Sequence, residues 1–227
     1  MKKQQRILLV EGQDDRAFFQ HFLCKLGLEV DIEPETPKNF CQTESDGVDV
    51  LRKMALPTAW HRITTGEITH LAIVIDADSQ TLGYGFIKRR EQITSTLSNY
   101  GYNIPEFSSI NNPGEIFTHP DGFTSIGLWI MPTHSTDGML EDLLLNNLNP
   151  KDNNQQALLD SADKAINDLG DLRTFKETHL SKARLSTLLA WQKKPGTSSG
   201  KAYQAGVFDT ESQAINLFIL WLQKVFA

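Results

Sequence analysis

Four carboxylates are the residues of this chain best placed to do chemistry, because they follow two strongly apolar segments. Glu11 and Asp15 follow the first segment, and Asp76 and Asp78 follow the second. Crowded carboxylates repel one another unless a cation neutralises them, and hard oxygen ligands favour Mg²⁺ or Mn²⁺. The pattern therefore predicts an acidic site for one or two divalent ions.

The two apolar segments have the pattern of strands buried on both faces of a parallel sheet. They are Arg6–Val10 and His70–Ile75. Open α/β sheets bind ligands at the carboxyl ends of their strands, where these acids lie. A helix that begins near Gly12 would return Asp15 to the neighbourhood of Glu11 within one turn. An isolated acid after a strand is more often a helix cap or a solvated loop residue, but here both segments end in acids.

Asp76 and Asp78 are two residues apart. In an extended chain, this spacing points both side chains to the same side. We therefore expect them to act as a pair.

The remaining pattern predicts an α/β fold with a mostly parallel sheet flanked by helices. Further strands are expected at 28–32 and 122–132, the latter forming a hairpin with 115–118, and a loop is expected at 33–47. Helices are expected at 14–26, 48–54, 87–99, 139–145, 154–168, 179–191 and 211–226, with Thr210 and Gln213 as a capping box for the last. We expect an α/β domain over residues 1–150 and a helical extension over 151–227 packed on the same core.

Composition is typical of a compact globular protein. The chain has 227 residues, of which 40% are hydrophobic and 22% charged, with a net charge of −6. This charge argues against passive binding of nucleic acid through a basic surface, but an enzyme site rich in carboxylates is compatible with it. Two cysteines, Cys24 and Cys41, indicate neither a disulfide framework nor a thiolate zinc site. The sequence also predicts no signal peptide and no membrane span, so we expect a cytoplasmic protein.

Two short motifs resemble those of the Toprim domain, which is shared by topoisomerases, bacterial primases, OLD-family nucleases and some ribonuclease maturases. The first is Val-Glu-Gly-x-x-Asp at 10–15, and the second is apolar-Asp-x-Asp at 75–78. The resemblance covers roughly residues 5–100 and implies a Toprim-like Rossmannoid fold. The remainder of the chain is similar to standalone bacterial Toprim-like proteins.

The resemblance also implies roles for single residues. It makes Glu11 a general acid/base or a metal ligand, and it makes Asp76 and Asp78 ligands of Mg²⁺ or Mn²⁺. Asp15 matches an additional acid of OLD-type nucleases, which favours a site with two ions. A lysine C-terminal to the acidic motifs would stabilise the transition state, and Lys182 is the candidate, with Lys201 as a rival.

For the other candidate residues, an ordinary structural role is an alternative to a role in the site. Glu141 and Asp142 would supply a further metal ligand if their helix packs near the sheet edge, or they are first-turn acids that complement the helix dipole. His134 lies in a loop near these acids and is more simply a surface residue. The glycine-rich segment 195–201 lacks the spacing of a phosphate-binding loop and is expected to be a flexible connector.

The leading hypothesis is a phosphodiesterase that depends on Mg²⁺ or Mn²⁺ and cleaves DNA or RNA with metal-activated water. A second is a non-catalytic Toprim-like module that assembles as a homodimer or with a partner such as an ATPase, because the final helix is apolar nearly all round. A third is a nucleotidyl transferase or primase-like activity. Metal-dependent cleavage, oligomeric state and nucleotide incorporation separate the three.

Overall fold

A computed structural model describes residues 4–80, 83–108 and 114–227 and contains one five-stranded sheet in the order β2-β1-β3-β5-β4. The strands are β1 (Gln5–Val10), β2 (Glu33–Glu35), β3 (Ile68–Asp76), β4 (Glu115–Phe117) and β5 (Ile126–Met131). The first four in the spatial order run parallel, and β4 pairs antiparallel with β5. The predicted α/β fold with a mostly parallel sheet is confirmed.

The central strands β1, β3 and β5 are buried on both faces, as their apolar runs predict. Leu8 of β1 pairs with Ala72 of β3, which lies beside Gly127 of β5. All three residues are buried. Since alternate residues point to opposite faces, the sheet must be covered by helices on both sides.

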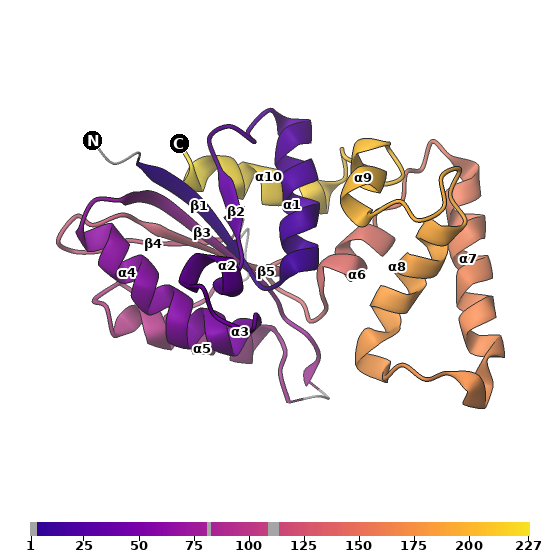
Figure 1. Ribbon diagram of the computed structural model, residues 1–227, viewed down its shortest axis with the longest axis horizontal. Coiled ribbons are helices and arrows are strands. Elements are labelled where there is room, and N and C mark those ends of the chain that lie inside the picture. The colour runs from indigo at the N-terminus through magenta and orange to yellow at the C-terminus, as the bar shows by residue number, and fades with distance from the viewer. Residues whose placement is uncertain (1–3, 81–82, 109–113) are drawn as a thin grey trace.

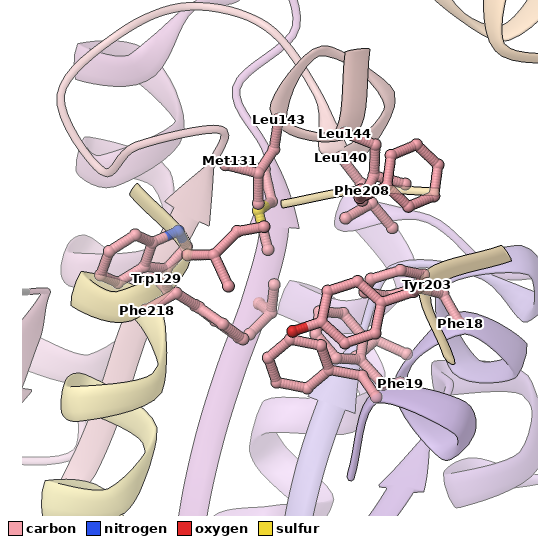
Figure 2. Close-up of a cluster of buried hydrophobic side chains, with 14 of the residues drawn as sticks. Phe18, Phe19, Trp129, Met131, Leu140, Leu143, Leu144, Tyr203, Phe208 and Phe218 are labelled. Atoms are coloured by element: carbon pink, nitrogen blue, oxygen red, sulfur yellow. The ribbon is translucent and has the colours of Figure 1, made fainter. Parts of the chain in front are cut away.

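One face is covered by helices from both ends of the chain (Figure 1). Helix α1 (Gln13–Leu26) shares this face with α10 (Gln213–Val225), and α9 (Ser199–Gln204) packs against α1. Figure 2 shows the resulting cluster, in which Phe18 and Phe19 of α1 lie near Tyr203 of α9 and Phe218 of α10. Residues from beyond position 150 therefore complete the core of the sheet.

The opposite face is covered by the helices that follow β2 and β3. They are α2 (Pro37–Cys41), α3 (Val48–Val50), the π-helical η1 (Leu51–Ala55), α4 (Leu56–Thr64) and α5 (Phe86–Ser98). The chain passes from β1 to β2 on one side of it, and then returns past β1 to β3 on the other side. The helices of these two connections lie on opposite faces of the sheet. The strand order consequently reverses between β1 and β3.

The remaining helices lie beyond the carboxyl edge of the sheet. Helix α6 (Leu140–Leu145) follows β5, and α7 (Asn153–Asp168) and α8 (Leu180–Ala190) form a pair at one end of the molecule (Figure 1). Two 3₁₀ turns, η3 (Gly170–Leu172) and η4 (Glu177–His179), join them. Because α8 packs against α6, this pair stands beside the strand ends.

Three local predictions were wrong. The segment 28–32 closes a turn, with the N–H groups of Asp31 and Ile32 bonded to the Leu28 carbonyl, and the strand forms later at 33–35. The segment 33–47 accordingly contains both β2 and α2 and is not simply a loop. Helix α10 begins after Ser212, whose hydroxyl accepts the Ile215 N–H, so Thr210 is not its cap.

The expected connector at 195–201 is partly helical. Helix α9 begins at Ser199 after Ser198, whose hydroxyl accepts the Lys201 N–H. Gly200 packs against the His21 ring, where a Cβ atom would come within 2.8 Å. In the described part of the chain, no helix is long and apolar enough to cross a membrane.

Candidate functional site

The candidate site lies at the point where the strand order reverses. Glu11 directly follows β1, and Asp76 is the last residue of β3, the adjacent parallel strand. Ligands of open α/β sheets bind at this kind of switch point. The Asp76 N–H donates a hydrogen bond of 3.3 Å to Glu11 Oε2, so the two strand ends are joined through a site residue.

Asp15 is brought to Glu11 by the first turn of α1. Gly12 is the N-cap of that helix, and its N–H donates to Asp15 Oδ2 at 3.0 Å. The carboxylate therefore satisfies one of the free donors at the start of the helix. This bond turns the side chain back towards the end of β1.

Helix α6 contributes a fourth carboxylate. Its first residue, Leu140, donates its N–H to Asp76 Oδ1 at 2.9 Å, which fixes the start of α6 against the end of β3. The next residue is Glu141, whose side chain is 15% exposed. Helix α6 thus packs at the sheet edge, as a metal-ligand role for Glu141 requires, and Glu141 is also an acid of the first helical turn.

The electrostatics of this group are unfavourable as they stand. Burial raises the pKa of Asp76 well above its ordinary range, and the charges of Asp15 and Glu11 add to the effect. Burial and the Glu11 charge raise the pKa of Asp15 to about 7. Burial also raises the pKa of Glu11 and of Glu141. Such values indicate carboxylates gathered without enough positive charge to compensate.

Lys182 of α8 is the lysine that lies against these carboxylates. Its Nζ is 3.8 Å from Glu141 Oε1, and its side chain is 48% exposed. Burial alone would lower the pKa of Lys182, but Glu141, Asp76 and Asp15 raise it. The rival Lys201 is exposed on α9.

Asp78 differs from the expected partner of Asp76. Its φ of 59° is left-handed, so the extended-chain argument that pointed both side chains one way does not hold. Its N–H and carbonyl bond to the carbonyl and N–H of Gly138, and its carboxylate pairs with Arg89 of α5. Asp78 still raises the pKa of Glu11, which places it beside the group.

Asp142 and His134 have structural partners. Asp142 accepts the Met139 N–H and the Ser181 hydroxyl, and it thereby joins the start of α6 to α8. His134 is buried rather than on the surface, contrary to its simpler reading. Its Nδ1 accepts the Ile130 N–H at 3.0 Å, and its Nε2 lies 3.3 Å from Glu115 Oε2. A neutral His134 must therefore carry its proton on Nε2 and donate it to Glu115.

The site gathers oxygen donors of the kind that hard cations take, but these donors are not arranged around one point. Among the described residues, no group of three or more His, Cys, Asp or Glu side chains has the geometry to hold a metal ion. Each of Glu11, Asp15 and Asp76 instead directs one oxygen to a backbone N–H.

Two residues that contact acids of this region were not predicted from the sequence. Arg89 lies on a helix surface by its spacing, and only the tertiary packing brings it to Asp78. Ser181 precedes Lys182 and bonds Asp142 across 39 positions of the chain. No local pattern marks either residue. The only hint in the sequence is that Ser181 directly precedes the candidate Lys182.

Comparison with known proteins adds a family. No curated protein and no solved structure matches the chain. One family model, described as a protein of unknown function (DUF3226), matches residues 5–227, which is nearly the whole sequence. The chain therefore belongs to the DUF3226 family.

Proposed function

We propose that this protein is a phosphodiesterase that depends on Mg²⁺ or Mn²⁺ and acts on DNA or RNA. The observation that carries the proposal is the gathering of Glu11, Asp15, Asp76 and Glu141 from separate elements at the switch point, with the pKa of each raised. Carboxylates whose pKa values are strongly perturbed are common at functional sites.

The donor set suits hard divalent cations. Carboxylate oxygens are the ligands that Mg²⁺ and Mn²⁺ prefer, and Asp76, Asp15 and Glu11 would hold them. When bound, the ions supply charge neutralisation and Lewis acidity towards a phosphate. Asp78 can contribute only if it exchanges its contact with Arg89, so it is the outer member of the set.

The chain's own side chains would divide the remaining work. Lys182 is half-exposed beside Glu141 and can stabilise the additional negative charge of a phosphoryl transition state. Glu11, whose pKa is raised by burial and by the charge of Asp78, is the candidate to hold or release a proton. The resemblance of the segments 10–15 and 75–78 to the Toprim motifs supports the same assignment.

The test uses a substitution that preserves the fold. Asp76→Asn retains an oxygen acceptor for the Leu140 N–H but removes the charge. Asp160→Asn, on the exposed side of α7, serves as the matched control. We expect the wild-type protein and the control to bind Mn²⁺ and to cleave plasmid, single-stranded DNA or structured RNA. We expect Asp76→Asn to lose at least a hundredfold in rate and to bind Mn²⁺ more weakly.

The proposal fails if none of these substrates is cleaved with Mg²⁺ or Mn²⁺ and Asp76→Asn binds metal as well as the wild type. Cleavage that survives Asp76→Asn unchanged would also overturn it, since the activity would then lie elsewhere or in a contaminant.

One observation favours a second candidate, a module that assembles with a partner or with a second copy. On the outer side of α10, Leu220 is 59% exposed and Leu217 is 38% exposed. Exposed leucines on one helix face are common at protein interfaces. Sedimentation of the purified protein would separate the two ideas, since a monomer that cleaves nucleic acid needs no partner.

A further inference from the structure

A pocket of about 660 Å³ opens next to Asp78, the outer member of the carboxylate group. It lies between the loop 132–138 after β5, helix α6, and the start of α8 with the preceding η4. Asp78 and Asp142 form part of its wall, so the pocket adjoins the candidate site. Its volume falls within the range of roughly 300–1,000 Å³ that is usual for ligand sites.

The acids in the wall are already engaged. Asp137 accepts the N–H groups of Gln80 and Phe86, at 3.1 and 2.8 Å. Asp142 accepts the Met139 N–H and the Ser181 hydroxyl. Asp78 pairs with Arg89. The fourth acid of the wall, Glu177, pairs with Arg173 at 2.7 Å. These partners hold the loop, the strand end and α6 together, so the carboxylates shape the pocket.

Apart from its four acids, each of which already has a partner, what the pocket offers a ligand is uncharged. Apolar surface comes from Pro132, Met139 and Leu143. Neutral polar groups come from Thr136, Asn146 and Thr178. No lysine or arginine occurs among the described residues that line it. A phosphate would find no cation there, whereas a flat heterocycle would find both apolar contact and hydrogen-bonding groups.

Asn146 is the polar residue best suited to contact such a ligand. It follows α6 as the C-cap, is exposed, and makes no side-chain hydrogen bond to any described residue. An asparagine amide can both donate and accept, which is the pattern needed at the edge of a nucleobase.

We propose that this pocket receives an unpaired nucleobase of the substrate strand while the adjoining phosphate lies at the carboxylates. The inference depends on the proposed function and adds its substrate class, a single-stranded or frayed nucleic acid. A base within a duplex is stacked and paired, and it can enter a recessed pocket only by leaving the helix. Single strands present bases that apolar and amide side chains can contact directly.

The test fills the pocket without disturbing the carboxylates. Asn146→Trp places a large ring at the exposed C-cap, and Asn167→Trp makes the same change on exposed α7, outside the pocket. Fluorescent single-stranded DNA and RNA 12-mers are titrated in Ca²⁺, which takes the same oxygen ligands as Mg²⁺. Duplexes of the same sequence and strands with one abasic position are titrated in parallel. Circular dichroism confirms that both variants are folded.

We expect single strands to bind at least tenfold more tightly than duplexes. Asn146→Trp and an abasic substitution at one position should each weaken binding about tenfold, and Asn167→Trp should change nothing. If duplexes bind as well as single strands, or if Asn146→Trp binds single strands like the wild type, the inference is overturned.

Failure of this inference differs from failure of the proposed function. Metal-dependent cleavage that is indifferent to strand pairing and to Asn146→Trp would refute the base pocket alone. Single-strand binding that Asn146→Trp weakens, in a protein that cleaves nothing with Mg²⁺ or Mn²⁺, would refute the phosphodiesterase alone. Absence of any nucleic-acid binding in Ca²⁺ would overturn the pocket assignment outright.

Discussion

Replacing Asp15 by Asn should stabilise the metal-free protein. The pKa of Asp15 is raised from an ordinary 3.8 to about 7, chiefly by burial and then by Glu11. A difference of about 3 pH units corresponds to about 4 kcal/mol, since each unit is worth about 1.4 kcal/mol. A raised pKa means that the folded state is favoured when the group is protonated, so this stability is present below pH 4 and is lost as the pH rises through 7.

Asparagine removes that penalty and retains the local bond. Its side-chain oxygen can still accept the Gly12 N–H that Asp15 accepts at 3.0 Å. At pH 8 in EDTA we therefore expect Asp15→Asn to raise the free energy of unfolding by up to about 4 kcal/mol. The gain should shrink as the pH falls and should approach zero near pH 4.

Urea denaturation at pH 4 to 8 measures this difference, with Asp14→Asn as the control on the adjacent exposed residue. Saturating Mn²⁺ should then reverse the order, because a ligand of the native state stabilises the wild type more than a variant that has lost a carboxylate. A variant less stable than the wild type at pH 8 in EDTA would refute the reasoning, as would a gain that does not depend on pH.

Three further predictions test other parts of the structure. Lys182→Met retains the aliphatic stem but removes the charge beside Glu141, so cleavage should slow at least tenfold. Calorimetry should show that the variant binds Mn²⁺ no more weakly than the wild type. An equal loss of cleavage in Lys201→Met would contradict this prediction. Burial lowers the pKa of His134, so its stabilising contribution is present above pH 6.5 and is lost as the pH falls below that value. The wild type should therefore lose its stability advantage over His134→Gln as the pH falls from 8 to 5 in urea denaturation. A difference that stays constant with pH would contradict this. Gly127→Ala would bring a Cβ atom within 2.5 Å of a Val225 methyl group on α10, so the free energy of unfolding should fall by about 1–3 kcal/mol. An unchanged free energy of unfolding in urea would mean that α10 does not pack on β5 as described.

The strand ends could be predicted from the sequence because they depend on local pattern. The runs that became β1 and β3 contain enough consecutive apolar residues to require burial on both faces. An acid directly after such a run must lie at the carboxyl edge of the sheet. The positions of Glu11 and Asp76 were therefore determined once the two strands were recognised.

The second strand could not be located in the same way. Residues 28–32 alternate like a strand, but the chain must first reverse direction after α1, and the turn takes these residues. Short strands such as β2 owe their place to the neighbouring strand they pair with, and three residues carry too little periodicity to identify them.

The tertiary structure alone decided which charges meet at the site. The helical pattern of 139–145 could not show where Glu141 would lie, and the Leu140 N–H bond to Asp76 brings this first-turn acid to the end of β3. The Asp-x-Asp spacing favoured Asp78 as the partner of Asp76, yet left-handed backbone and Arg89 hold it to one side. Such outcomes depend on contacts between residues distant in sequence, whose distances only the folded chain sets. The sequence thus determined which edge of the sheet carries the acids, while packing determined which four of them lie together.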